Sequence, residues 1–592
     1  MEKMTLSQNA LRVLEARYLR RNQDRRIVET PAELFESVAR GVAFAELLLG
    51  SASKARYWEE KYYDLMSSLD FLPNTPTLMN AGKPLGQLSA CFVLPVEDSI
   101  EGIFDALKNM ALVQRTGGGT GFSFSRLRPK GDIVQSTAGE SSGPVSFMKI
   151  FDCATDNIKQ GGKRRGANMG VLRVDHPDIL EFIWAKRDGA SFRNFNLSVG
   201  VTDDFMNAVK EDGELNLVDP AGRVKGSLLA RAVFQAIAEA AWLSGDPGLV
   251  FLDAINRANP TPHLGAIEAT NPCGEIPLLP YESCNLGSLN LAHMLRAENG
   301  RPAVDWEKLG STVHTATRFL DDVIEVSKYP IPEIEKMTRG NRKIGLGVMG
   351  FAETLIRLGI SYDSGEAVQT AEKIMHFIAL EAEEASKALA EERGVFSRWK
   401  GSALEAKGIK VRNATRTAIA PTGTIGIIAG TSPSIEPLFA LAYRRSHVLG
   451  EQTLFEVNPL LLEFLDGHGL KAQEILDQVL RKGSIRDAVG IPEELKHLFV
   501  TALEIPAKQH LQIQAAFQRH VDNSVSKTVN LPHEATIQDV ADTYRLAWEL
   551  GLKGITIYRY GTKSAQVLEL GVGEEAHHYD HASRCDPGEC KV

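Results

Sequence analysis

From about residue 72 to residue 565, short apolar segments alternate with longer amphipathic stretches. The short segments include residues 89–94, 119–124, 196–201, 415–420 and 554–558. One amphipathic stretch opens at Asp363 and ends at Gly394, with apolar residues at helical spacing between them. Alternation of strand-length and helix-length segments is typical of α/β architecture, so we expect a fold of the α/β class.

The two ends of the chain differ from this central region. Thr30, Pro31 and Glu33 combine a capping box with a proline at the first helical position, which predicts a helix through the apolar run that follows. Prolines near residue 72 break the helical pattern, and few apolar residues remain after residue 565. We therefore expect a helical N-terminal domain over residues 1–71, a large α/β domain over 72–565 and a flexible C-terminal tail over 566–592.

Composition excludes several classes of protein. The chain has 592 residues, of which 43% are hydrophobic and 24% are charged, as in globular proteins. The formal net charge of −9 provides no basic surface for a nucleic-acid backbone, so we expect no nucleic-acid partner. The N-terminus lacks the apolar core of a signal peptide, and no apolar run is long enough to span a membrane. We expect a cytoplasmic protein, and its six cysteines are too few for a disulfide framework.

Asn271, Cys273 and Glu275 place an amide, a thiol and a carboxylate at alternate positions. In an extended loop alternate side chains share one side, so we expect the three groups to converge on one small substrate. The alternative is that Cys273 is an inert packing residue, as most buried cysteines are.

The segment around this motif extends further. Residues 269–278 read ATNPCGEIPL, residues 283–291 read SCNLGSLNL, and Cys284 follows Cys273 by eleven residues. Together with the remote Cys91, this segment resembles the finger loop of ribonucleotide reductases. The resemblance extends from about residue 5 to 592 and implies a ten-stranded α/β barrel of two half-barrels, with the Cys273 loop at its centre.

The resemblance also implies a role for each residue of the motif. Cys273 becomes a thiyl radical and abstracts the 3′ hydrogen of a ribonucleotide, and Glu275 is the general base for the 3′-hydroxyl. Asn271 holds that region of the sugar by hydrogen bonds. Cys91 and Cys284 supply a proton and two electrons, water leaves, and the pair ends as a disulfide.

The tail carries Cys585 and Cys590, whose spacing resembles the redox tail of many family members. On a flexible tail they can reduce the internal disulfide by thiol exchange, and thioredoxin or glutaredoxin would recharge them. A zinc site that also uses the histidines of the tail is the alternative; these are His577, His578 and His581. Cys153, in a helical stretch beginning near Val145, is expected to be a packed core residue.

Substrate phosphates need backbone amides that face an anion. The PTGTI segment, formed by Pro421, Thr422, Gly423, Thr424 and Ile425, follows an apolar strand and resembles the family's phosphate loop. Thr77, Ala90 and Gly119 resemble further substrate-binding positions. The alternative for the glycines is a tight turn.

The GLGVMG segment at residues 345–350 matches the glycine pattern of dinucleotide-binding folds. No buried strand precedes it, and Asp363 is too close to be the acidic ribose partner that such folds carry about twenty residues further on. We therefore expect these glycines to be a structural part of the barrel.

Regulatory residues are also implied by the resemblance. Asp98, Ser99, Ile100 and Arg128 match residues that bind a deoxynucleotide or ATP effector, and loops 131–143 and 187–196 match the segments that transmit effector identity to the substrate base. The alternative for Asp98 is a cap on the helix starting near residue 101. No room remains for the ATP-binding helical module that precedes the barrel in many members, so we predict that its on/off switch is absent.

The radical source is identified by elimination and overall similarity. The oxygen-dependent class relays a radical through two adjacent tyrosines, and Thr556 and Ile557 stand where that pair would be. The glycyl-radical class would not need the full set of thiols. The adenosylcobalamin-dependent class remains, and residues 514–524 resemble it, although no residue can be named as a corrin contact and no metal ligand is predicted.

We therefore expect an adenosylcobalamin-dependent ribonucleotide reductase, acting on diphosphates as a homodimer. The sequence leaves diphosphate and triphosphate substrates open. Two alternatives are the catalytic subunit of the oxygen-dependent class and a catalytically silent nucleotide-binding regulator that kept the barrel.

Overall fold

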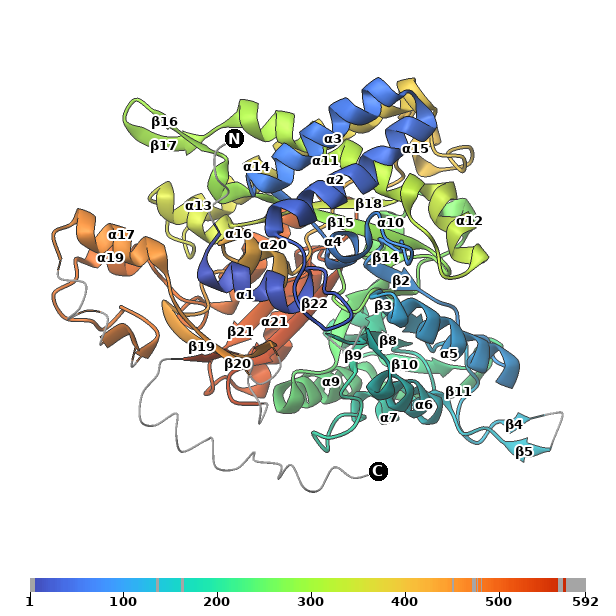
Figure 1. The fold of residues 1–592 in the computed structure, drawn as a ribbon. Helices are drawn as coiled ribbons and strands as arrows, with labels where there is room; N and C mark the ends of the chain where they lie inside the picture. The colour runs from blue at the N-terminus through green and yellow to red at the C-terminus, as the bar shows by residue number, and fades with distance from the viewer. Residues whose placement is uncertain are drawn as a thin grey trace.

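The computed structural model describes residues 6–134, 138–160, 164–449, 452–470, 475, 478–480, 482–562 and 568–570. A ten-stranded sheet lies at its centre, in the order β1-β15-β2-β3-β8-β9-β12-β22-β21, with β18 paired to β15 (Figure 1). Segment 415–420 closes the sheet, because Thr417 bridges Leu346 of β18 and Ile419 bridges Val525, just before β21. The structure therefore confirms the predicted α/β barrel.

The barrel consists of two half-barrels of parallel strands. In the first half, β2, β3, β8, β9 and β12 run parallel to one another. In the second half, β15, β18, segment 415–420, β21 and β22 are parallel. The halves meet at two antiparallel seams, β15 with β2 and β12 with β22. The strands are β1 (Phe71–Pro73), β2 (Cys91–Val93), β3 (Gly119–Ser123), β8 (Asn168–Arg173), β9 (Phe195–Val201), β12 (Gly248–Phe251), β15 (Ser283–Asn290), β18 (Ile344–Met349), β21 (Thr528–Leu531) and β22 (Gly554–Arg559).

Helices connect the parallel strands and cover the outside of the barrel, as right-handed crossovers require. Two large apolar cores lie between the barrel and its helices: one contains residues of β1, β15 and β18, and the other contains residues of the first half-barrel together with β21 and β22. The connecting helices are α5 (Ile100–Arg115), α6 (Pro144–Asn157), α7 (Ile179–Ile183), α8 (Asp203–Lys210), α9 (Ala230–Ser244), α11 (Trp306–Val326), α12 (Pro332–Asn341), α13 (Phe351–Arg357), α14 (Gly365–Arg393), α20 (Ala507–Gln518) and α21 (Ile537–Glu549). Shorter elements are α4 (Thr75–Asn80), α10 (Leu252–Arg257), α15 (Ala403–Ala406), α16 (Gly423–Ala429), α17 (Pro459–Gly467) and α19 (Glu493–Leu498).

Small sheets of two or three strands lie outside the barrel sheet, and β20, β19 and β23 form the three-stranded one. One of the two-stranded sheets, β4 with β5, projects from the molecule beside α5 (Figure 1). Their strands are β4 (Ile133–Val134), β5 (Gly139–Glu140), β6 (Lys159–Gln160), β7 (Arg164–Arg165), β10 (Glu214–Val218), β11 (Val224–Leu229), β16 (Leu295–Glu298), β17 (Arg301–Val304), β19 (Ala442–Leu449), β20 (Gln452–Val457) and β23 (Leu568–Leu570).

A short hairpin, β13 (Ala269–Thr270) with β14 (Pro277–Leu278), lies inside the barrel against β2, β3 and β8. We call residues 269–278 the finger hairpin. Its apolar side chains pack with residues that point inward from the strands, including Met169 and Ala418. A Cβ built on Gly121 of β3 would lie only 1.7 Å from the Thr270 carbonyl oxygen, so this close approach requires glycine.

The GLGVMG glycines behave as predicted, because they form strand β18 and its end. A Cβ on Gly347 would lie 2.2 Å from the Ala418 carbonyl oxygen, in the neighbouring segment of the barrel. The glycines therefore let two strands approach closely and are a structural part of the barrel, as predicted.

The N-terminal helices are α1 (Gln8–Arg17), α2 (Pro31–Leu49) and α3 (Ala52–Ser67). The predicted capping box is present, since Thr30 accepts the Glu33 N–H and Glu33 accepts the Thr30 N–H. The predicted amphipathic stretch from Asp363 to Gly394 is helix α14, which is capped by Ser364 and ends before Gly394, and the Asp363 carboxylate accepts the Ser361 hydroxyl. The domain boundaries at residues 71 and 565 remain predictions.

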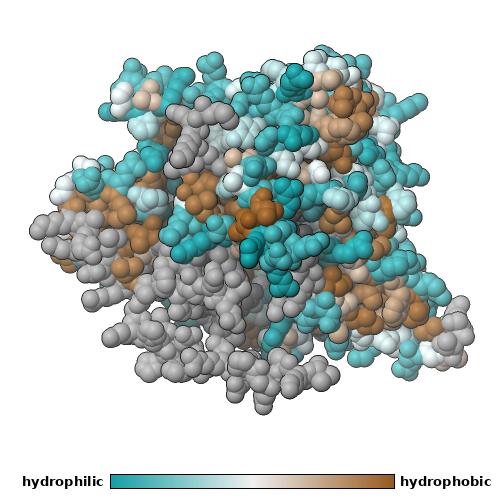
Figure 2. Space-filling view, in the orientation of Figure 1, coloured by the Kyte–Doolittle hydropathy of each residue, from teal (hydrophilic) through white to brown (hydrophobic). Residues whose placement is uncertain are grey.

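No helix within the described residues is long and apolar enough to cross a membrane. Figure 2 shows the view of Figure 1 by hydropathy, with hydrophilic side chains over much of the face and hydrophobic areas in separate patches.

Buried charges join α2 to the barrel helices. The Glu46 carboxylate, 1% exposed, accepts Arg393 Nη2 at 2.6 Å and Arg318 Nε at 2.5 Å. Arg393 also contacts Asp322 at 2.7 Å, and Asp322 accepts the buried Tyr62 hydroxyl of α3. Because these charges are buried, each depends on its partners.

We predict that Glu46→Gln destabilises the protein by about 3–5 kcal/mol, because it leaves a buried guanidinium short of charge compensation. The control is Glu36→Gln on the same helix, which removes an exposed pair with Arg40 and should cost at most about 0.5 kcal/mol. Thermal unfolding followed by circular dichroism would compare the two variants. Equal midpoints would contradict the prediction.

Candidate active site

The tip of the finger hairpin is a tight turn. Asn271 Oδ1 accepts the Ile276 N–H at 2.9 Å, and the Asn271 carbonyl accepts the Gly274 N–H at 3.1 Å. Gly274 has a φ of 82°, in the left-handed region that favours glycine. The side chains of Asn271 and Glu275 are buried, whereas Cys273 is exposed. Convergence of the motif therefore comes from a turn, and the predicted alternation of an extended loop is wrong.

Cys91 and Cys284 face each other across a seam of the barrel. Cys91 on β2 is the direct register partner of Cys284 on β15, in an antiparallel pair. Side chains at directly opposed antiparallel positions have Cβ atoms about 4.5–5.5 Å apart, which is close to what a disulfide needs. Both cysteines are buried, and neither forms a disulfide in this structure.

Polar contacts connect Cys91 to the finger hairpin. Asn271 Nδ2 donates to Cys91 Sγ at 3.1 Å, and the Cys91 thiol donates to Glu275 Oε1 at 3.9 Å. Glu275 Oε2 has no hydrogen-bond partner among the described residues. Three of the predicted residues thus meet at one point, and one buried carboxylate oxygen there has no partner among the described residues.

Burial favours the neutral form of each of these groups. Desolvation raises the pKa of Glu275 to about 7. Desolvation also raises the pKa of Cys91 well above its usual range, helped by Glu275, Cys284 and Cys273 nearby. The pKa of Cys284 is likewise raised, chiefly by burial. The opposed pair is therefore present as two thiols, the form that holds transferable hydrogens.

Cys273 lines a cavity of about 860 Å³, within the range of ligand pockets. The wall combines residues of the finger hairpin, the phosphate-loop region, strands β9 and β22, and the ends of α9 and β12. Among them are Asn196, Asp246, Gly248, Pro272, Glu353, Pro421, Gly423, Glu436, Lys527 and Tyr558. Cys91, Cys284, Asn271 and Glu275 are buried and are not among the residues that line this cavity.

The predicted phosphate loop reaches the same cavity. Pro421 and Gly423 line it, and Gly423 is the first residue of α16. Thr422 adopts a left-handed conformation with a φ of 50°, and its hydroxyl accepts the Ser434 N–H at 2.6 Å. Arg17 of α1 donates to the Thr424 hydroxyl at 3.4 Å, so the N-terminal helices support this loop.

The other predicted substrate residues lie beside the finger hairpin. A Cβ on Gly119 would lie 2.8 Å from Pro272 Cγ and 3.7 Å from the Ala90 carbonyl oxygen. Thr77 is 1% exposed, and its hydroxyl contacts Asn74 Oδ1 at 2.5 Å and the Leu88 carbonyl at 3.0 Å. The Thr77 hydroxyl therefore already serves the local fold.

The predicted effector residues gather at the start of α5, at an edge of the molecule (Figure 1). Asp98 accepts Arg128 Nε at 2.8 Å, which brings two of them together. Ser99 caps α5 by accepting the Gly102 N–H, so the alternative role of Asp98 as the cap is wrong. Ile100 is 59% exposed.

Cys153 lies on α6 and is exposed, so the expectation of a packed core residue is wrong. Its neighbours Phe151 and Thr155 face the core instead. Cys585, Cys590 and the three histidines of the tail lie outside the described residues.

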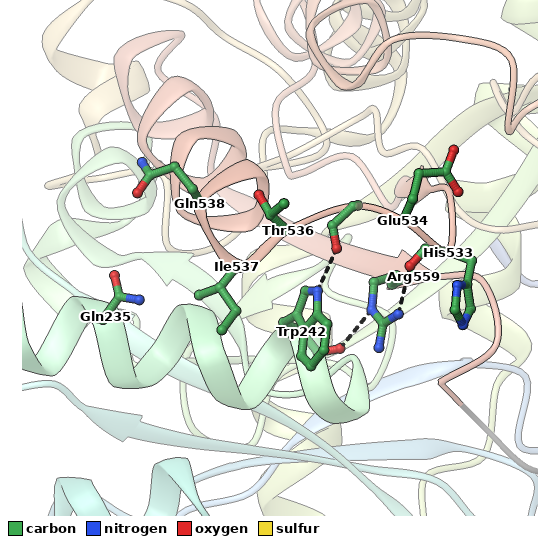
Figure 3. A pocket seen from close by; sticks show the side chains of 9 residues that line it. Gln235, Trp242, His533, Glu534, Thr536, Ile537, Gln538 and Arg559 are labelled. Carbon is green, nitrogen blue, oxygen red and sulfur yellow. Dashed lines mark hydrogen bonds between the residues drawn. The ribbon is translucent and has the colours of Figure 1, made fainter.

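A second hollow, of about 790 Å³, lies between α9, α21 and β22 (Figure 3). Arg559 stacks on the Trp242 ring at 4.0 Å and donates to the Trp242 carbonyl at 3.1 Å and the His533 carbonyl at 2.9 Å. Trp242 Nε1 donates to the Ala535 carbonyl at 2.6 Å. These contacts hold the end of α9 against β22, and no cysteine lines the hollow.

Sequence reasoning missed several polar residues of the main cavity. Lys527, fully buried, donates to Glu436 Oε2 at 2.5 Å, and both residues line the cavity. Asn196 and Asp246 line it as well. These four residues come from separate segments of the chain and form no local sequence motif. Their place in the cavity wall is therefore known only from the structure.

Known proteins resemble the chain along most of its length. The family descriptions "Ribonucleotide reductase, all-alpha domain" and "Ribonucleotide reductase, barrel domain" match residues 4–86 and residues 89–411 and 403–558. A "Vitamin B12-dependent ribonucleoside-diphosphate reductase" from Thermoplasma acidophilum is 51% identical over 96% of this chain and 81% of its own length. A protein of the same name from Mycobacterium tuberculosis (strain CDC 1551 / Oshkosh) shows the same identity and coverage.

A solved structure is similar too. The "Actinobacillus ureae class Id ribonucleotide reductase alpha subunit" superimposes with a TM-score of 0.77 and 26% identity, over 95% of this chain and 99% of that one. With the barrel, the finger hairpin and these matches together, the chain belongs to the ribonucleotide reductase family.

Proposed function

We propose that this chain reduces ribonucleoside diphosphates to 2′-deoxyribonucleotides by thiyl-radical chemistry that depends on adenosylcobalamin. The observation that carries the proposal is the position of Cys273. This residue lines a ligand-sized cavity, while the buried Cys91 contacts Asn271 and Glu275 of the same hairpin and is paired in register with the buried Cys284. The names of the most similar relatives support the diphosphate substrate and the cofactor.

Cys273 starts the reaction as a thiyl radical. It takes the hydrogen atom from the 3′ carbon, so the S–H bond forms as the C–H bond breaks. Glu275 accepts the 3′-hydroxyl proton, and the raised pKa of Glu275, about 7, lets it accept and return a proton near neutral pH. Asn271 orients the sugar and already holds the Cys91 sulfur.

Cys91 and Cys284 provide the reducing equivalents. They give two electrons and two hydrogens, their sulfurs join as a disulfide, and the 2′-hydroxyl leaves as water. Cys273 then returns its hydrogen to the 3′ carbon and is a radical again. The net change is one ribonucleotide and two thiols converted to one deoxyribonucleotide, one disulfide and one water.

The backbone amides at the start of α16 would hold the substrate phosphates. Pro421, Thr422, Gly423, Thr424 and Ile425 form this loop, with Ala90, Gly119 and Thr77 supporting the sugar side. The loop and Cys273 share one cavity, which supports a substrate that spans them.

The cavity that Cys273 lines has small residues in its wall, namely Gly245, Gly248 and Thr556. Thr556 stands where the oxygen-dependent class would place its first relay tyrosine. Small side chains leave space for a bulky group, so these residues, with Ile557 and Tyr558, would hold adenosylcobalamin. When bound, adenosylcobalamin supplies homolysis of its cobalt–carbon bond, the one-electron chemistry that a thiol does not start alone.

The remaining partners are part of the same proposal. Asp98, Ser99, Ile100 and Arg128 would bind a deoxynucleotide or ATP effector, in a homodimer. Cys585 and Cys590 would pass electrons from thioredoxin or glutaredoxin to the internal disulfide. With domain boundaries at residues 71 and 565, the effector site lies in the barrel domain and the two cysteines lie in the tail. The protein would act in the cytoplasm.

We predict that Cys273→Ser abolishes deoxynucleotide formation and leaves substrate binding intact, because a hydroxyl does not replace a thiol in this hydrogen transfer. The control is Cys153→Ser, which changes the other exposed described cysteine and should retain full turnover. Product analysis and equilibrium dialysis of the ribonucleotide would measure both properties. A silent nucleotide-binding regulator would be the better description if wild type and Cys273→Ser behaved alike.

We predict that kcat/KM rises with pH through about 7, because Glu275 must be ionised to accept the proton. Glu275→Gln should lower the rate by about 10²- to 10⁴-fold and remove this acid limb. The measurement is the pH profile of single-substrate turnover for both proteins. An unchanged profile in the variant would exclude Glu275 as the base.

The same shift predicts an effect on stability. The folded pKa of Glu275 lies above its ordinary value of 4.5, so the folded state binds the proton more tightly. This contribution to stability is present below about pH 4.5 and is lost as the pH rises through about 7. Glutamine at this position does not titrate, so Glu275→Gln should keep the same stability over this range while wild type loses stability. The unfolding midpoint of Glu275→Gln minus that of wild type should therefore increase from pH 5 to pH 8. A constant difference across that range would contradict the assignment.

We predict turnover by the purified chain with adenosylcobalamin, a ribonucleoside diphosphate and a dithiol, without a second protein. The absence of the tyrosine pair at Thr556 and Ile557 is the reason. Chromatographic detection of the deoxynucleotide measures it, with omission of the cofactor as the control. Activity that appears only after addition of a radical-generating subunit would favour the oxygen-dependent class.

A further inference from the structure

Asn196 ties the finger hairpin to strand β9. Its Nδ2 donates to the Pro272 carbonyl oxygen at 2.8 Å. That carbonyl belongs to the peptide group that joins Pro272 to Cys273, so the contact fixes the plane from which the cysteine side chain starts. The two residues are 76 positions apart in the chain, and both line the main cavity.

Asn196 also ends loop 187–196, whose base is held by a buried ion pair. Lys186 and Asp246 are 14% and 11% exposed and lie 3.0 Å apart. Lys186 also donates to the Phe195 carbonyl, and Asp246 Oδ1 accepts the Leu197 N–H at 3.0 Å. We call Lys186, Asp246 and Asn196 the loop clamp.

The loop clamp connects the two ends of loop 187–196 to each other and to the wall of the main cavity, because Asn196 and Asp246 are part of that wall. Asp246 fixes the backbone on one side of Asn196 through Leu197, and Lys186 fixes it on the other side through Phe195. The Asn196 amide is thereby aimed at the Pro272 carbonyl. A displacement of the loop would be transmitted to Cys273 through this single side chain.

We propose that Asn196 is a positioning residue: it holds Cys273 in place for hydrogen transfer and links the radical cysteine to loop 187–196. The inference rests on the proposed function, because the position of Cys273 matters only if its sulfur reacts. Misplacement of a reacting atom by about 1 Å can cost about 10²-fold in rate, so one hydrogen bond next to the sulfur is enough to matter.

The test uses Asn196→Asp, which keeps the shape of the side chain but replaces the donor with an acceptor that repels the Pro272 carbonyl. Ser198→Ala is the matched control, because Ser198 lies two residues along the same strand and lines the same cavity. Lys186→Met tests the link to the loop. Unfolding midpoints would identify any variant that fails to fold.

The first measurement needs no cofactor. Alkylation of Cys273 by iodoacetamide is followed by peptide mass spectrometry, with the exposed Cys153 as the internal reference. We expect Asn196→Asp and Lys186→Met to change the Cys273 rate severalfold in the same direction, with the Cys153 rate unchanged. Ser198→Ala should leave both rates as in wild type.

The second measurement is steady-state turnover of the holoenzyme. We expect Asn196→Asp to lower kcat about 10²-fold with KM within twofold of wild type. A rise in KM with kcat unchanged would make Asn196 a substrate contact and overturn the inference. Unchanged alkylation in Asn196→Asp would overturn it as well, and a response in Asn196→Asp but not in Lys186→Met would overturn the link to the loop.

The two hypotheses fail separately. If wild type forms no deoxynucleotide but the Cys273 alkylation rate depends on Asn196, the proposed function fails and the positioning contact stands. If wild type is active and the alkylation rates do not respond, the contact fails alone.

Discussion

The finger hairpin fits in the centre of the barrel only because the neighbouring strand, β3, has glycines in place of larger side chains at the points of contact. Strand β3 carries glycine at residues 119 and 121, where a Cβ would collide with Pro272 and Thr270. At Gly121 the strand backbone packs against the Thr270 backbone, and at Gly119 it packs against the Pro272 ring, so the depth of the hairpin is fixed without flexible side chains. The positions of Cys273, Asn271 and Glu275 within the barrel follow from these contacts.

Burial separates Cys91 and Cys284, which are buried, from Cys273, which is exposed. Cys91 and Cys284 lie out of water and remain protonated, which suits the transfer of hydrogen atoms. Thiol–disulfide exchange instead needs a thiolate that another thiol can reach. In the proposed mechanism, the environment that favours reduction of substrate thus opposes recharging, so the two half-reactions need different local conditions at the same pair of residues.

Much of this arrangement could be predicted from sequence, where the signal is local. The capping box at Thr30, the alternation of strands and helices, and the segment around Cys273 each lie within a few neighbouring residues. Asn196, Lys527 and Glu436 could not be found in this way, because their partners come from distant parts of the chain. The turn at Asn271 does not follow from the residue spacing, since the hydrogen bond from the Ile276 N–H to Asn271 Oδ1 reverses the backbone within five residues. The exposure of Cys153 does not follow from the sequence either, because Asp152 on one side and Ala154 on the other do not indicate which face of α6 it occupies.

The opposed cysteines, Cys91 and Cys284, could also change the rigidity of the barrel. They lie on the seam where the first half-barrel meets the second, a junction that in the reduced protein is held by hydrogen bonds and packing alone. In the proposed mechanism, each turnover would form a disulfide that joins the two half-barrels covalently at that point, and reduction would break it. The barrel would then alternate between a cross-linked form and a form without the cross-link, and its rigidity would depend on whether the disulfide had been reduced since the last turnover.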